Sequence, residues 1–197
     1  MTLAHRRLLV VLTLLIAVPG CSGVFSQLHT ATGSAPLCMP DRELGRVVVL
    51  PETAWRIDQK DVPEREAMAL RALDRAFSID ECGGDTDVRE LSNWSSVIES
   101  SWLDALGEEG AETVVFVRIE EVGPTVAVTF SLPLLWISTS EAQLRVRAIH
   151  VPTREVLLDA GLKRSVGGPF QLRPAAWAEA ELEAALLALL RATETTA

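Results

Sequence analysis

Cysteine and histidine side chains are the groups in this chain with the most reactive chemistry. The cysteines are Cys21, Cys38 and Cys82, and the histidines beyond the first 20 residues are His29 and His150. A metal site would need more ligands than Cys38, Cys82, His29 and His150 offer. His29 lies in a Ser- and Gly-rich stretch that cannot hold it rigidly. His150 ends a predicted strand beside a turn, and we interpret it as a solvated residue. We therefore expect no catalytic residue, metal or cofactor.

The N-terminal segment has the layout of a secretory signal peptide. Arg6 and Arg7 give it positive charge, residues 8–18 are apolar apart from one threonine, and Gly20 precedes Cys21. A cysteine directly after the cleavage position resembles the lipobox of bacterial lipoproteins, in which it becomes the acylated first residue. The apolar run is too short for a membrane span, which needs about 20 residues. A plain secretory signal, with Cys21 as an ordinary thiol, is the remaining alternative.

Removal of residues 1–20 would leave an acidic chain. All 27 acidic residues but only 16 of the 18 basic residues lie beyond this segment, so the net charge there is −11. Such a chain repels phosphate backbones, which excludes nucleic acid as a partner. It also gains nothing from an anionic membrane surface. We therefore expect attachment to a membrane through acyl chains on Cys21.

The pattern of apolar residues predicts a two-layer α/β (α+β) domain, with a mixed, mostly antiparallel sheet of about five strands packed by three helices. Residues 1–20 are assigned to the signal, 21–43 to the lipidated cysteine and a flexible tether, and 44–193 to one globular domain. Helices are predicted at residues 61–78, 95–106 and 174–191. Strands are predicted at residues 47–51, 112–121, 125–138, 143–151 and 155–162, with turns at Gly123-Pro124 and at residues 152–154.

Cys38 and Cys82 flank the first predicted pair of a strand and a helix. Because an antiparallel helix returns the chain to the edge where the strand began, we expect the two thiols to lie close together. A signal peptide implies an oxidising compartment, so we predict a disulfide between Cys38 and Cys82. Two separate buried thiols are the alternative.

The segment at residues 125–138 combines two patterns. Its apolar residues alternate as in a strand buried on one face, but near its end both faces become apolar. We interpret this end as a candidate contact surface for a partner protein or for lipid, made of Leu132, Leu134, Leu135, Trp136 and Ile137. The alternative is that the final helix and the core of the domain bury both faces.

Three local patterns resemble the small envelope domain shared by the TolB N-terminal region, CsgG, LpoB and PelC. They are the strand at residues 47–51 before an amphipathic helix, the helix-to-strand step at residues 105–115, and the hairpin at residues 144–157. The similarity spans residues 44–191. It implies a non-catalytic periplasmic lipoprotein that works through envelope proteins as partners, often as a homo-oligomer.

This resemblance favours a lipid-anchored scaffold or accessory subunit in cell-envelope assembly, secretion or polysaccharide export. Ser22 after Cys21 is typical of sorting to the outer membrane, so we expect a periplasm-facing protein on that membrane. Two alternatives remain open. One is a lipoprotein that binds a glycan or another small ligand, with Trp55 or Trp94 stacking on a sugar. The other is a degenerate hydrolase built around His150.

Overall fold

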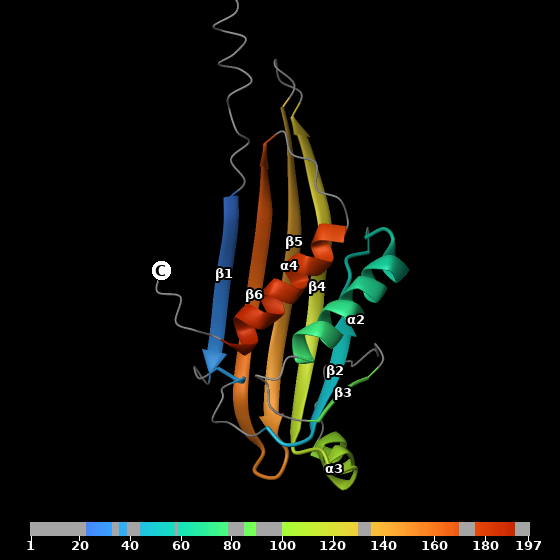
Figure 1. The fold of residues 1–197 in the computed structure, drawn as a ribbon, viewed down its shortest axis with the longest axis vertical. Coiled ribbons are helices and arrows are strands. Elements are labelled where there is room, and N and C mark those ends of the chain that lie inside the picture. Colours follow the sequence, from blue (N-terminus) through green and yellow to red (C-terminus); the bar gives the residue numbers. More distant parts are fainter. Residues whose placement is uncertain are drawn as a thin grey trace, which may run out of the picture.

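The structure is a computed structural model and describes residues 23–32, 36–38, 44–57, 59–78, 85–89, 100–129, 135–169 and 176–191 of the 197-residue chain. These residues form one six-stranded sheet and three helices in an open, two-layer α+β fold (Figure 1). The predicted fold class is confirmed. The sheet has one strand more than the sequence indicates.

The sheet has the strand order β1-β6-β5-β4-β2-β3. β1, β6, β5 and β4 pair antiparallel, whereas β2 pairs parallel with both β3 and β4. The sheet is therefore mixed and mostly antiparallel, as predicted. The strand bounds are Gly23–Thr32 (β1), Val47–Thr53 (β2), Thr86–Val88 (β3), Thr113–Thr129 (β4), Leu135–His150 (β5) and Glu155–Pro169 (β6).

Three helices pack on this sheet: α2 (Val62–Phe77), α3 (Ser100–Glu108) and α4 (Ala176–Leu190). Each overlaps a predicted helix. α2 forms one buried stripe because its apolar residues recur at spacings of three and four, whereas Arg71, Asp74 and Arg75 are exposed. No helix within the described ranges is long and apolar enough to cross a membrane.

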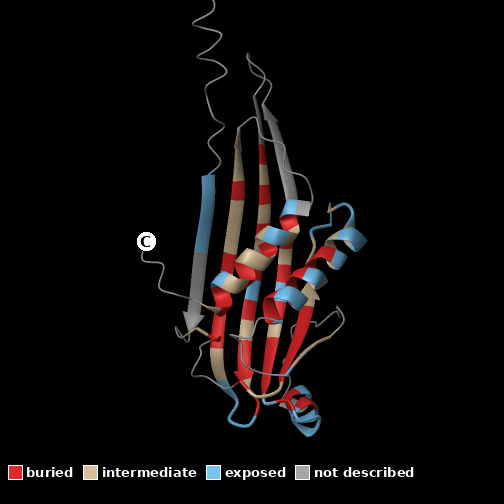
Figure 2. Cartoon of the chain, viewed as in Figure 1, coloured by how far each residue is buried: buried red, intermediate tan, exposed pale blue. Residues whose placement is uncertain are grey.

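The helices cover the two faces of the sheet unequally. α2 and α4 lie across one face, and α3 lies at one end of the sheet (Figure 1). Val47 and Val49 of β2 belong to the main core with α2 and α4, whereas Val48 and Leu50 form a smaller cluster with Leu106 of α3. Since successive residues of a strand point to opposite faces, α3 packs on the face that α2 and α4 leave uncovered. Figure 2 shows buried segments on α2 and α4 and on the strands beneath them.

The prediction of a flexible tether at residues 21–43 is wrong for part of that range. Residues Gly23–Thr32 form β1, which pairs with β6 along the edge of the sheet. Leu37 and Cys38 are buried, and the N–H of Cys38 donates to the carbonyl oxygen of Leu190 at the end of α4 (2.9 Å). An edge strand exposes much of its surface, so its sequence can be as polar as that of a linker. The folded unit therefore begins before residue 44.

The predicted turn at Gly123-Pro124 is also wrong, because β4 continues through both residues to Thr129. A bulge between Ile119 and Glu121 precedes them, and Gly123 has a φ of 144°. β2 pairs with β4 only as far as Ile119. Beyond that point no strand of the described residues pairs with this edge of β4, so the missing N–H of Pro124 costs no sheet hydrogen bond there.

Candidate functional site: the open face of the sheet

Among the described residues, α3 covers the face of the sheet opposite α2 and α4, and it does so only at one end. Farther along β4, β5 and β6, alternate residues place charged side chains on this face, because their sequence neighbours fill the main core. Arg145, for example, lies between the buried residues Leu144 and Val146. We call this surface the open face and define it by Glu52, Arg118, Glu120, Gln143, Arg145, Arg147, Asp159 and Lys163.

Ion pairs connect neighbouring strands across the open face. Asp159 of β6 is buried and accepts two hydrogen bonds from Arg145 of β5, at 3.0 Å from Nε and 2.9 Å from Nη2. Arg118 of β4 lies 3.6 Å from a carboxylate oxygen of Glu52 and 3.7 Å from one of Glu120. Carboxylates from β2, β4 and β6 therefore hold the guanidinium groups of Arg118 and Arg145 in place.

Arg147 is the third arginine of this face. Its register partners are Phe116 on β4 and Asp159 on β6, but Asp159 bonds to Arg145 instead. The Nε of Arg147 is buried and has no hydrogen-bond partner among the described residues. A shallow pocket of about 180 Å³ opens here, lined by Leu50, Glu52, Phe116, Val117, Arg118, Arg145 and Arg147. Guanidinium groups bind carboxylates through paired hydrogen bonds, so this pocket is suited to a carboxylate-bearing ligand.

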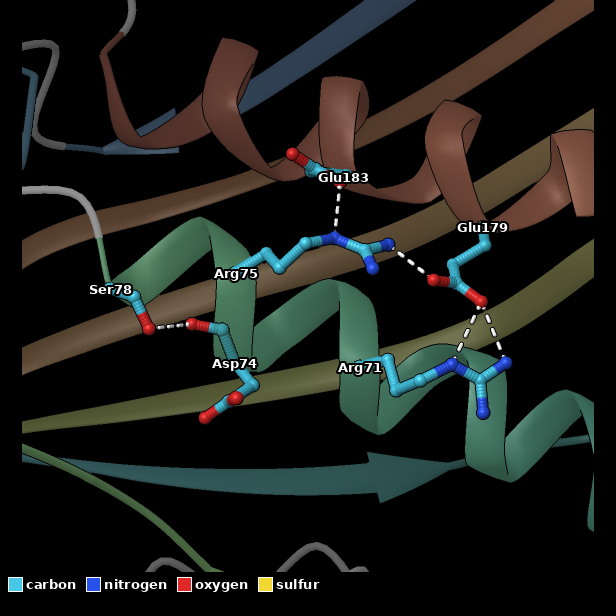
Figure 3. Close-up of polar contacts among 6 residues, drawn as sticks. All are labelled: Arg71, Asp74, Arg75, Ser78, Glu179 and Glu183. Atoms are coloured by element: carbon cyan, nitrogen blue, oxygen red, sulfur yellow. Dashed lines mark hydrogen bonds and ion pairs between the residues drawn. The ribbon is translucent and has the colours of Figure 1, made fainter.

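The opposite side of the molecule carries a second charged cluster, between α2 and α4 (Figure 3). Glu179 of α4 accepts hydrogen bonds from Arg71 of α2, at 3.0 Å from Nε and 2.7 Å from Nη2, and it also contacts Arg75. Arg75 donates in turn to Glu183 (2.8 Å). These hydrogen bonds, led by that from Arg71, hold the pKa of Glu179 below its usual range against the effect of burial. The cluster joins the two helices, and we interpret it as structural.

The structure places one of the predicted disulfide cysteines. Cys38 is buried and disulfide-bonded, and its partner lies outside the described residues. Cys21 and Cys82 both lie outside them as well. The pairing of Cys38 with Cys82 and the lipidation of Cys21 therefore stay predictions.

The predicted contact surface is only partly described. Leu132 and Leu134 lie outside the described residues. Leu135, Trp136 and Ile137 are the first three residues of β5, where they pair with residues 129, 128 and 127 of β4. Their role in contacting a partner or lipid stays a prediction.

His150 and Trp55, which the sequence singles out for other chemistry, have local partners. Nδ1 of His150 lies 2.8 Å from Oγ1 of Thr153 in the turn between β5 and β6. Trp55 packs against the main core, and its Nε1 donates to Glu66 (3.3 Å). Trp94 lies outside the described residues. In the part of the chain that the structure describes, no three His, Cys, Asp or Glu side chains are placed to hold a metal ion.

Sequence reasoning missed the open face as a site. The alternation of Arg145 and Arg147 is visible in the sequence and indicates one strand face. Asp159, however, reaches Arg145 only through the register of β5 with β6, which includes a bulge between Ala148 and Ile149. The pairing of charges across strands depends on this register. Charge alternation in two successive strands is the signal that points to such a face, but it does not identify the partners.

The described residues together define a two-layer α+β domain in which one charged face of the sheet carries a helix only at one end. No protein-family model and no curated protein matches the sequence. Among solved structures, the chain is similar to the PelC L103M dodecamer from Paraburkholderia phytofirmans, with 12% identity over 85% of this chain and 99% of that chain and a TM-score of 0.45.

Two further solved structures show a weaker likeness. The lipoprotein GNA1162 from Neisseria meningitidis is 10% identical over 71% of this chain and 93% of its own, with a TM-score of 0.35. The LpoB C-terminal domain from Salmonella enterica is 15% identical over 69% of this chain and 90% of its own, with a TM-score of 0.29. PelC and LpoB are two of the proteins that the sequence resemblance names. At these identities the likeness concerns the fold alone, and no residue role is carried across.

Proposed function

We propose that this protein is a non-catalytic, lipid-anchored envelope protein that serves as a scaffold or accessory subunit in envelope assembly, secretion or polysaccharide export. Cys21 is the acylated residue, and the folded domain faces the periplasm from the outer membrane. The open face is the surface that binds its protein partner. The observation that carries this proposal is the placement of three arginines on the bare face of an otherwise acidic domain.

The chemistry of the open face indicates the kind of partner. A bare sheet face with a shallow pocket is suited to a flat contact between proteins rather than to an enclosed small ligand, which needs a concave cavity. Arg118, Arg145 and Arg147 stand close together, and arginine is enriched at residues that dominate binding between proteins. A partner segment that carries aspartate or glutamate side chains would place its carboxylates against the guanidinium groups of Arg118, Arg145 and Arg147, which line one pocket.

The glycan-binding alternative receives less support from the described residues. Sugar stacking requires an aromatic ring with one free face. Trp55 is only partly accessible, packs against the main core and hydrogen-bonds to Glu66. Its ring is therefore held as part of the fold, and the open face remains the better candidate for binding.

The proposal is tested in two stages with the full chain in its native host. First, mass spectrometry of the N-terminal peptide should show cleavage after Gly20 and acyl chains on Cys21, and Cys21→Ser should abolish both. Second, a photo-crosslinking amino acid is placed at Arg147 on the open face and, as the matched control, at Asp74, an exposed residue of α2 on the opposite side.

The expected result is a discrete crosslinked protein of the envelope from position 147 and none from position 74. The crosslink should weaken when Arg118 and Arg145 are both replaced by glutamine, because the partner then loses its guanidinium contacts. Equal crosslinks from both positions, or none from position 147, would contradict the role of the open face. An unmodified Cys21 would contradict the anchor independently of that result.

A further inference from the structure

One row of residues crosses four strands close to the start of β1. Gly23 of β1 pairs with Gly167 of β6, Gly167 pairs with Thr139 of β5, and Thr139 pairs with Thr125 of β4. β1 begins at this row, whereas β4 and β5 continue past it to their last described pair, residues 129 and 135. The start of β1 and the far end of the β4–β5 pair therefore lie at the same end of the molecule (Figure 1).

The strand register determines how far the residues before β1 and the end of the β4–β5 pair can extend beyond this row. From Thr139 to Leu135 the strand advances by about 13 Å, at about 3.3 Å per residue. Cys21 precedes Gly23 by two residues, so its Cα can lie at most about 7 Å beyond the row. When the sheet stands upright, the end of the β4–β5 pair thus extends about 6 Å farther than the attachment point of the acyl chains.

The amino-acid composition of the β4–β5 end is suited to an apolar environment. Residues 122–140 contain no charged side chain. A strand pair without charged side chains can enter an apolar phase without the cost of removing ionised groups from water.

We propose that this end of the sheet enters the lipid leaflet that holds the acyl chains of Cys21, so that the domain stands upright on the membrane. The inference rests on the proposed lipid anchor and adds an orientation to it. The occupant is lipid rather than a second copy of the chain, because the two-residue link holds this end within reach of the leaflet. A depth of about 6 Å is typical of interfacial segments, which enter by about 5–10 Å.

The orientation has a consequence for the opposite end. β4 begins at Thr113, twelve residues before Thr125, and α3 immediately precedes it. At about 3.3 Å per residue, α3 lies about 40 Å from the row that begins at Gly23. α3 and the turn between β5 and β6 therefore point away from the membrane, and the open face stands perpendicular to it.

Tryptophan quenching tests the orientation. Full-length acylated protein is placed in vesicles of neutral phosphatidylcholine that contain brominated acyl chains. One variant keeps only Trp136 and a matched variant keeps only Trp102, an exposed residue of α3, with the other tryptophans replaced by phenylalanine. We expect the bromolipid to quench Trp136 by at least half and Trp102 by less than a tenth. The quenching should not change between low and high salt, because no charge takes part.

Equal quenching of the two tryptophans in acylated protein would overturn the orientation and leave the lipid anchor intact. A mass without acyl chains would overturn the anchor, and the orientation with it. If the single-tryptophan variants do not fold, Trp136→Phe in the otherwise unchanged chain should remove the quenched component of the fluorescence. Quenching that survives Trp136→Phe in full would also overturn the proposal.

Discussion

Arg118 on β4 and Arg145 on β5 are register partners, so two positive charges face each other directly across the open face. Like charges in this position destabilise a sheet. The structure compensates them from outside the pair, with Asp159 of β6 on one side and Glu52 of β2 on the other. Of these carboxylates Asp159 is the more deeply buried and hydrogen-bonded, so the charge balance of the face depends most on this residue.

Asp159→Asn should therefore destabilise the fold. The substitution keeps the shape but removes the negative charge beside Arg145, and hydrogen bonds to charged groups contribute about 1.5–3 kcal/mol each. Because Arg145 is more than half exposed and water screens the pair, we expect a loss of about 1 kcal/mol. Urea unfolding of the unacylated Cys21→Ser chain measures it. Lys163→Ala is the control, because its ammonium lies 3.8 Å from Glu141 in a partly exposed pair, without a hydrogen bond, that should contribute less than about 0.5 kcal/mol.

The contact between Glu179 and Arg71 should make stability depend on pH in the acidic range. The pKa of Glu179 is lowered in the folded protein, chiefly by the hydrogen bond from Arg71. A lowered pKa means that the folded state favours the ionised carboxylate. The contribution is therefore complete above the usual glutamate pKa of about 4.3 and is lost as the pH falls through the lower folded value.

Glu179→Gln measures this contribution. At pH 7 we expect the variant to be less stable than the parent chain by under about 1 kcal/mol, since both arginines are half exposed. The difference in the free energy of unfolding should disappear only when the pH falls well below the usual glutamate pKa, because the carboxylate of the parent chain then takes up its proton. Urea unfolding at several pH values between 7 and 3 follows it, with Glu155→Gln, at an exposed glutamate of β6, as the control. A stability difference that does not change with pH would show that the packing of the Glu179 side chain, and not its charge, holds α2 and α4 together.

Some elements could be predicted because the residues that specify them are close together in the sequence. The apolar stripe of α2 repeats at helical spacing, and the turn between β5 and β6 separates two alternating runs. Both predictions are confirmed. β1 could not be predicted in this way, since its residues are stabilised by pairing with β6, more than 120 residues later in the chain.

The open face shows a second limit of sequence reasoning. Arg145 and Asp159 are 14 residues apart, and they meet only because two strands adopt one register with one bulge. A shift by one residue would turn each side chain to the opposite face of the sheet. The sequence therefore indicates that alternate positions are charged, but the partners of each charge follow from the assembled sheet.

Gly123→Ala should destabilise the fold through two effects. Gly123 has a φ of 144°, a conformation that side chains rarely adopt, and an added Cβ would overlap the guanidinium of Arg65. That guanidinium also donates to the carbonyl of Val122 and lies 3.7 Å from Glu121. We expect a loss of about 2–3 kcal/mol in urea unfolding, with about 1 kcal/mol from backbone strain and the rest from the displaced contacts of Arg65.

Gly110→Ala is the matched control for this glycine. It also has a positive φ, of 87°, but an added Cβ would meet only Nη1 of Arg46, at 3.7 Å. This substitution should therefore cost the backbone strain alone, about 1 kcal/mol. Equal losses at the two positions would argue that the contact of Arg65 with the bulge in β4 does not contribute to stability.

The proposed pairing of Cys38 with Cys82 gives the last prediction. Cys38 anchors the chain before β2 to the end of α4, through its hydrogen bond to Leu190. A bridge to Cys82 would close a loop that contains β2 and α2, and loops of this length stabilise by about 4 kcal/mol in the chain-entropy model. Cys82→Ser should lower stability by up to this amount, whereas Cys21→Ser should leave it unchanged. Peptide mapping without reduction must then show one crosslinked peptide that contains Cys38 and Cys82. A bridge from Cys38 to Cys21 would contradict both the pairing and the acylation, because one sulfur cannot serve both bonds.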